Sequence, residues 1–144
     1  MARALGIDYG SVRIGLALSD ELGLLAHPLE TISPDKQAVA RIVEIVRTRD
    51  VSHAVIGIPR TMKGEMGPAA EEARAFAEKL RAALPCPLIL WDERLTTVAA
   101  HRALQEAGKK TKETRAYVDQ VAAQMILQGY LDQQQLLQSN EPEP

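Results

Sequence analysis

Three acidic residues stand at positions where a carboxylate is unusual. Asp8 lies inside an apolar run, with one glycine two residues before it and another two residues after it. Glu93 follows the apolar run PLILW, and Asp119 lies where apolar residues recur at helical spacing. Because an unpaired carboxylate is costly to bury, each acid must serve a turn, a cap, an ion pair or a bound cation.

The chemistry that these acids could perform together is metal-assisted hydrolysis. Converging carboxylates repel one another unless a cation neutralises them. Mg²⁺ prefers carboxylate oxygens, combined with water and substrate phosphate. Two such ions can hold the attacking and leaving oxygens of a phosphodiester. Taken singly, each acid is more typical of a turn, a cap or a surface ion pair, so the fold must decide.

The elements that would position the acids follow from apolar periodicity and turn signals. We expect five strands, over residues 3–10, 12–20, 24–32, 52–59 and 87–91. We expect four helices, one starting near Ser33–Asp35 and the others over residues 68–83, 96–104 and 116–134, with a basic loop at 109–115. This order predicts an α/β fold whose mixed five-stranded sheet has three antiparallel strands, then two parallel ones, and helices on both faces.

The predicted fold brings the three acids to one end of the sheet. Asp8 ends the first strand, and Glu93 ends the last. On the final helix, Asp119 shares a face with apolar residues that include Ala122 and Ala123. These small side chains would let the helix approach the sheet closely, so we expect Asp119 to point toward it.

Composition limits the classes of protein that this chain can represent. With 144 residues, 46% of them apolar, residues 1–135 are expected to form one domain, followed by a disordered polar tail at 136–144. The net charge of −2 gives no overall attraction to nucleic acid, although a local patch can still bind phosphate. A single cysteine, no apparent signal peptide and no apolar run of about 20 residues predict a cytoplasmic protein without membrane contact.

Four motifs occur in an order that is similar to one known family. They are GIDYGSVRIGLALSD at 6–20, GIP at 57–59, DERLTT at 92–97 and DQVAAQMIL at 119–127. Together they resemble the YqgF family, also called RuvX, over about residues 3–132. That family is a bacterial branch of the ribonuclease H-like fold, related to the RuvC-type Holliday-junction resolvases.

The resemblance implies a nuclease that matures the 5′ end of pre-16S rRNA with Mg²⁺ or Mn²⁺, in a site for two ions. Carried over position by position, the catalytic and metal-binding acids fall on Asp8, Glu93 and Asp119. One position departs from the RuvC branch, where the final helix carries a second acid three residues after the first. Here that position is Ala122.

Candidate nucleic-acid contacts surround the acids in the sequence. Residues 94–115 contain six Lys and Arg but only two acids. This local excess of positive charge could bind phosphate. The candidates are Gly10, Arg60, Lys63, Arg94, Thr96, Thr97, Lys109, Lys110, Lys112 and Arg115. Gly10 is equally typical of a hairpin turn, and one threonine could be a helix cap. We expect Arg13 to be an ordinary strand-surface arginine.

Other functions remain open from the sequence. Actin-like sugar kinases and ATPases share the N-terminal Asp-x-Gly turn, but they bind ATP between two lobes, and 144 residues make only one. A non-catalytic nucleic-acid-binding module is a second alternative. Within the nuclease reading, single-stranded or branched DNA competes with pre-16S rRNA as substrate, because phosphate contacts carry little sequence information. Monomer and homodimer are both compatible with the sequence.

Overall fold

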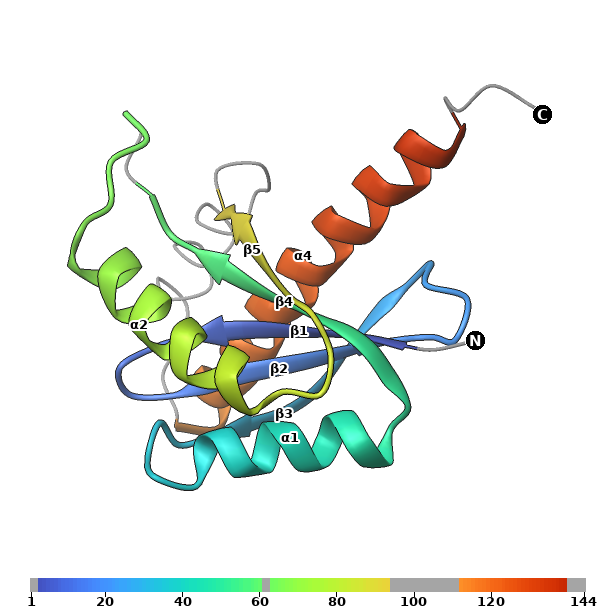
Figure 1. The fold of residues 1–144 in the computed structure, drawn as a ribbon. Coiled ribbons are helices and arrows are strands. Elements are labelled where there is room, and N and C mark those ends of the chain that lie inside the picture. The colour runs from blue at the N-terminus through green and yellow to red at the C-terminus, as the bar shows by residue number, and fades with distance from the viewer. Residues whose placement is uncertain (1–2, 61–62, 94–111, 140–144) are drawn as a thin grey trace.

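A five-stranded sheet forms the centre of the protein (Figure 1). The computed structural model describes residues 3–60, 63–93 and 112–139, and within the last range the side chains of 117–138. The strands are β1 (Arg3–Tyr9), β2 (Ile14–Ser19), β3 (Ala26–Ile32), β4 (Val51–Ile58) and β5 (Leu88–Asp92), in the spatial order β3-β2-β1-β4-β5. The strands β1 to β3 are antiparallel, and β4 is parallel to both β1 and β5. The predicted α/β sheet is therefore confirmed.

Helices cover both faces of this sheet, as expected. Helices α1 (Ala38–Thr48) and α2 (Pro68–Ala83) lie on one face, and the long α4 (Lys112–Ser139) crosses the other (Figure 1). No helix in the described part of the chain combines the length and the apolar character needed to cross a membrane.

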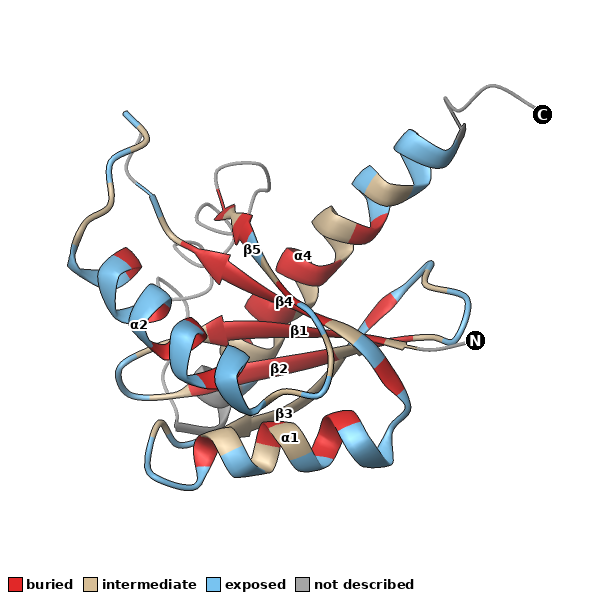
Figure 2. Ribbon diagram, viewed as in Figure 1, coloured by how far each residue is buried: buried red, intermediate tan, exposed pale blue. Residues whose placement is uncertain are grey.

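Alternation along the strands creates one apolar core on each face (Figure 2). Leu5 and Ile7 of β1 pack with the apolar faces of α1 and α2. On the other face, Ala4 of β1 and Val55 of β4 pack beneath α4. Trp91 belongs to this second core, where its ring meets Tyr130 edge-on.

Small residues allow α4 to lie directly on the sheet. A Cβ atom placed on Gly6 would come within 2.8 Å of the Ala123 carbonyl oxygen. On Gly15 it would lie only 2.0 Å from the carbonyl oxygen of Asp119. Ala122 and Ala123 are fully covered, which confirms that the alanine face of this helix packs on the sheet.

Glutamine side chains tie α4 to the edge strand β3 and to the turn before it. Gln124 donates to the carbonyl oxygen of Ala26 at 2.9 Å. Gln128 accepts from the amide of Ala26 at 2.9 Å and donates to the carbonyl oxygen of Leu24 at 2.8 Å. These bonds satisfy backbone groups at a sheet edge and hold the helix in one register, which also places Asp119.

Three predicted helix boundaries are wrong. The first helix begins at Ala38, because the Asp35 carboxylate accepts the Gln37 amide at 2.8 Å and turns the chain before it. Helix α4 already begins at Lys112, so the predicted basic loop is helical from there onward. It also continues to Ser139, four residues into the predicted tail, since 112–115 and 136–139 contain no glycine or proline. The predicted helix at 96–104 and the end of the tail lie outside the described residues.

Candidate active site

Asp8 lies near the end of β1 on the face that carries α4. It pairs with Gly15 of the antiparallel strand β2, and residues opposite each other share one face of a sheet. The backbone of Asp119 passes directly over Gly15, so α4 brings its acid to the strand beside Asp8. Asp8 is only 5% exposed, which is unusual for a carboxylate.

Glu93 reaches the same face from the end of β5. A Cβ atom placed on Gly57 of β4 would lie 2.7 Å from Glu93 Oε1, so the carboxylate occupies the space above this glycine. The parallel pairing of β1 with β4 reaches Ile7 and Ile56, and the next residues along are Asp8 and Gly57. Neighbouring strands lie about 5 Å apart, so Glu93, which is 7% exposed, stands beside Asp8.

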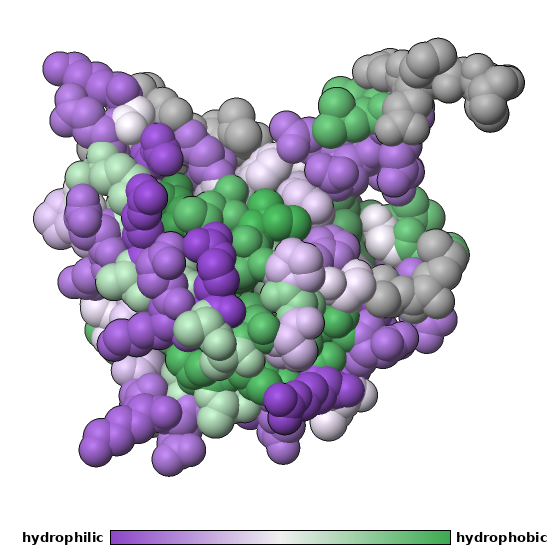
Figure 3. Space-filling view, viewed as in Figure 1, coloured by the Kyte–Doolittle hydropathy of each residue, from purple (hydrophilic) through white to green (hydrophobic). Residues whose placement is uncertain are grey.

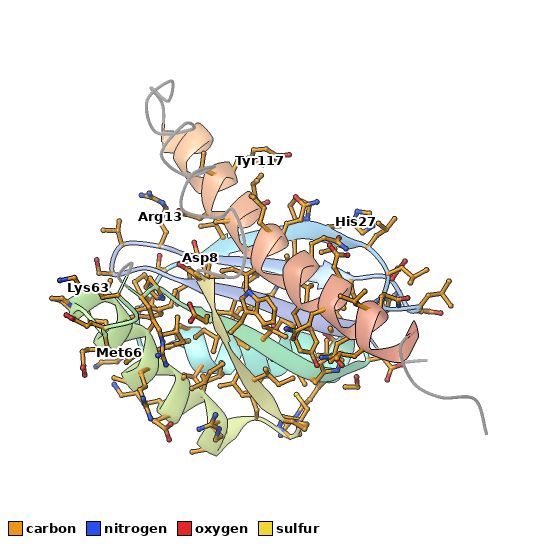
Figure 4. The ribbon with its side chains drawn as sticks, turned by 90° about the horizontal axis from the view of Figure 1, so that it is seen from above. Asp8, Arg13, His27, Lys63, Met66 and Tyr117 are labelled. Atoms are coloured by element: carbon orange, nitrogen blue, oxygen red, sulfur yellow. The ribbon has the colours of Figure 1, made fainter. Side chains whose placement is uncertain are left out.

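The structure thus places all three predicted acids on one face and at one end of the sheet. Asp8 occupies the central strand, between Gly15 beneath Asp119 and Gly57 beneath Glu93. Figure 4 shows Asp8 at this end, near the start of α4, with His27 toward the opposite end. The glycines provide the room that side chains on the flanking strands would otherwise fill.

The carboxylate of Asp119 is held by Arg13. The arginine Nε donates to Asp119 Oδ2 at 2.5 Å, and the two side chains are 30% and 17% exposed. In the described part of the chain, no three His, Cys, Asp or Glu side chains stand close enough to hold one ion. The three predicted ligands therefore share one end of the sheet without forming a closed three-acid cluster, and the Asp119 carboxylate is turned toward Arg13.

The remaining two acids suit a hard divalent cation. Asp8 and Glu93 offer buried oxygen donors from adjacent positions, and Gly57 leaves space between the strands that carry them. Mg²⁺ commonly binds through one or two carboxylates and completes its shell with water and substrate phosphate. The donor set of Asp8 and Glu93 therefore fits such an ion.

Arg13 belongs to the site, although an ordinary strand-surface arginine was expected at this position. A signal for its role existed in the hairpin register. Gly15 pairs with Asp8, and Arg13 precedes Gly15 by two residues, so strand alternation continued one residue beyond β2 points Arg13 to the face of Asp8. The register does not predict the rotation of α4 about its axis, and this rotation puts the Asp119 carboxylate within reach of Arg13.

We expect Arg13→Gln to lower the free energy of unfolding by about 1 kcal/mol, between the values typical of exposed and buried ion pairs. Asp119→Asn should cost a similar amount, and the double variant should cost little more, because both changes remove one interaction. Urea unfolding in metal-free buffer measures the three differences. The more exposed pair Arg3–Glu21, at 3.5 Å, is the matched control and should show almost no coupling. Strict additivity at Arg13 and Asp119 would contradict the pairing.

The predicted nucleic-acid contacts are placed only in part. A Cβ atom on Gly10 would lie 2.7 Å from the Arg13 carbonyl oxygen, so this glycine is required by the tight β1–β2 turn. Lys63 lies at the same end of the molecule as Asp8 (Figure 4), and Arg60 donates weakly to the Gly64 carbonyl oxygen at 3.5 Å. Lys112 and Arg115 belong to the first turns of α4 by their backbone. Arg94, Thr96, Thr97, Lys109 and Lys110 lie outside the described residues.

Comparison with known proteins identifies a family over almost the whole chain. Residues 2–133 match the family model described as "RuvX: Holliday junction resolvase". A relative from Chloroflexus aurantiacus, named "Putative pre-16S rRNA nuclease", is 49% identical over 89% of this chain and 85% of its own. Relatives of the same name from Nocardia farcinica and Halalkalibacterium halodurans are 50% and 46% identical, covering 91% and 93% of this chain and 78% and 99% of their own.

A solved structure supports the fold at lower identity. Thermus thermophilus RuvC, in a complex with a Holliday junction substrate, superimposes with a TM-score of 0.56. It is 15% identical, and the match covers 94% of this chain and 96% of RuvC. This likeness confirms the ribonuclease H-like sheet and helix arrangement.

Proposed function

Because the chain belongs to the RuvX family, we propose that it is a divalent-metal-dependent nuclease that hydrolyses phosphodiester bonds of pre-16S rRNA. The observation that carries this proposal is the pair of buried carboxylates Asp8 and Glu93, side by side at one end of the sheet. Relatives that are close to half identical bear the corresponding name.

The roles of the residues follow from their positions. Asp8 and Glu93 would hold Mg²⁺ or Mn²⁺, and Asp119 would add an oxygen donor from α4. The bound ions would supply Lewis acidity at the scissile phosphate and activate water for in-line attack. Arg13 would hold Asp119 in place and add positive charge where the phosphate enters. Burial of the acids excludes bulk water and thereby strengthens their interaction with a cation.

We expect Mg²⁺ or Mn²⁺ to raise the melting temperature of the protein, because an ion that binds only the folded state stabilises it. At a metal concentration a hundredfold above the dissociation constant, the free energy of unfolding rises by about 2.7 kcal/mol. In a chain of this size, each kcal/mol raises the melting temperature by about 2–4 °C. Differential scanning fluorimetry with increasing metal measures the rise. The triple variant Asp8→Asn, Glu93→Gln, Asp119→Asn should show none, and an equal rise there would place the ions elsewhere.

The test of the activity itself is a panel of substrates. Purified protein with Mg²⁺ or Mn²⁺ should shorten a pre-16S rRNA 5′ fragment, and this cleavage should stop in EDTA. Branched DNA is the second candidate substrate, favoured by the description of the family and represented in the panel by a four-way junction. Where the RuvC branch carries the second acid of the final helix, this chain has Ala122, which is buried against the sheet. We therefore expect the protein to cut the RNA in preference to the four-way junction. Cleavage of the junction alone would assign the protein to DNA instead.

A further inference from the structure

A small cavity lies on the α2 side of the sheet, back to back with the acids. Its volume is about 190 Å³. The apolar part of its wall comes from Ile58, Met66, Leu90 and Trp91, and the polar part from Arg60, Arg74 and Asp92. Four separate segments thus contribute: the end of β4, the loop that follows it, α2 and the end of β5.

Strand alternation explains why the cavity and the acids are close. Gly57 and Glu93 belong to the α4 face, whereas the neighbouring residues Ile58 and Asp92 pair with each other and line the cavity. The two features therefore lie one residue apart along two adjacent strands, on either side of the sheet. Because β5 is the edge strand, a polymer that crosses the end of the sheet could reach both.

The cations of the cavity are available for a ligand. Arg60 comes from the loop after β4 and Arg74 from α2, and neither forms an ion pair with another described residue. Guanidinium groups suit phosphate because they donate several hydrogen bonds in one plane. Two of them against the single carboxylate of Asp92 leave the lining of the cavity positive, which favours an anionic ligand.

The apolar part of the wall indicates that the ligand also has an apolar surface. Leu90 is 36% exposed although it is a large aliphatic residue, and Ile58 and the partly buried Met66 continue the apolar surface inward. Figure 3 shows hydrophobic side chains open to the surface between α2 and β5, with strongly hydrophilic ones beside them. The volume of the cavity is below the usual 300–1,000 Å³ or so of sites for drug-sized ligands, so only a small group, about the size of one base, fits.

We propose that this cavity receives one unpaired nucleotide of a single-stranded substrate, next to the phosphate that lies at the acids. The base packs on Ile58, Met66 and Leu90, and the adjoining phosphate accepts hydrogen bonds from Arg60 and Arg74. Proteins commonly recognise RNA through such splayed-out single-stranded bases. The inference deepens the proposed function and rests on it for the path of the strand across the sheet.

The first test measures binding without hydrolysis. The full chain is titrated against a short fluorescent single-stranded RNA in EDTA, and fluorescence anisotropy gives the dissociation constant at several salt concentrations. Arg74→Gln and Arg60→Gln should each weaken binding roughly tenfold, as expected for a lost charge-assisted hydrogen bond. Each should also reduce the slope of log affinity against log salt by about 0.7. Arg47→Gln, an exposed arginine of α1 away from this cavity, should change neither quantity.

The second test asks whether the cavity holds a base. The wild type should bind the RNA more tightly than a ribose-phosphate strand of equal length without bases. Leu90 is partly exposed, so its position tolerates a polar side chain. Leu90→Gln should therefore reduce the difference in affinity between the RNA and the strand without bases. An affinity for RNA and a salt slope that stay unchanged in Arg74→Gln would overturn the inference. It would also be overturned if Leu90→Gln preferred the RNA over the strand without bases as strongly as the wild type does. Failure of the wild type to bind either strand would overturn it as well.

These outcomes can be told apart from failure of the proposed function. Cleavage of pre-16S rRNA by a protein whose Arg74→Gln variant binds normally would leave the nuclease assignment in place and remove the nucleotide site. Loss of RNA binding in Arg74→Gln, in a protein that cuts no RNA with either metal, would retain the site and remove the activity. Circular dichroism and melting temperature confirm that each variant is folded.

Discussion

Asp8→Asn should abolish cleavage of pre-16S rRNA and leave the protein folded. Asp8 occupies the central strand of the site, with Glu93 above the neighbouring glycine on one side and Asp119 above the glycine on the other. Loss of one carboxylate ligand removes several kcal/mol of transition-state stabilisation, so the rate should fall by at least about a thousandfold. Single-turnover cleavage with saturating metal measures this loss.

The same substitution should cost little stability. Asparagine keeps the volume of the aspartate, and it removes a negative charge that stands near two others. We therefore expect the melting temperature in metal-free buffer to stay the same or to rise slightly. Asp132→Asn, an exposed acid more than three turns farther along α4, is the matched control and should cleave like the wild type. A collapsed melting temperature in Asp8→Asn would make Asp8 structural, and activity within a few-fold of wild type would remove it from the site.

Gly15→Ala should destabilise the protein more than a methyl group added at any other position of the site. A Cβ atom there would lie 2.0 Å from the carbonyl oxygen and 2.3 Å from the carbonyl carbon of Asp119. Both are backbone atoms of α4, so relief requires the whole helix to move away from the sheet. Overpacking of this kind costs about 2–3 kcal/mol, which corresponds to a melting temperature lower by about 5–10 °C.

The displacement should also reduce activity, because Asp119 moves with the helix backbone. We expect cleavage by Gly15→Ala to fall at temperatures well below its melting point, where the protein is still folded. Gly67→Ala provides the control, since a Cβ atom there meets nothing within 4 Å and its backbone is extended. If Gly15→Ala melted and cleaved like Gly67→Ala, close contact between α4 and β2 would not be needed for the site.

Much of the fold was predictable because it depends on neighbouring residues. Alternation of apolar residues and short turns predicted the hairpin of β1 and β2, and the helical spacing after Asp119 predicted the face of α4 that packs on the sheet. The alanines at 122 and 123 predicted its close approach. Helix ends were predicted less well, because the charged residues 112–115 are compatible with both a loop and the first turn of a helix.

That Asp8, Glu93 and Asp119 share one end of the sheet was predictable from the sequence, because a hairpin and two helical crossovers set the order of the strands that these acids follow or face. The contact between Arg13 and Asp119, 106 positions apart in the chain, is visible only in the folded protein. The tertiary structure also decided that Arg60 and Arg74 meet at one cavity. The physical reason is that local patterns assign a residue to a face, whereas contact across the chain depends on the rotation and register with which a helix settles on the sheet. Here the glycines at 6 and 15 and the glutamines of α4 set that register, through packing distances and hydrogen bonds between segments far apart in sequence.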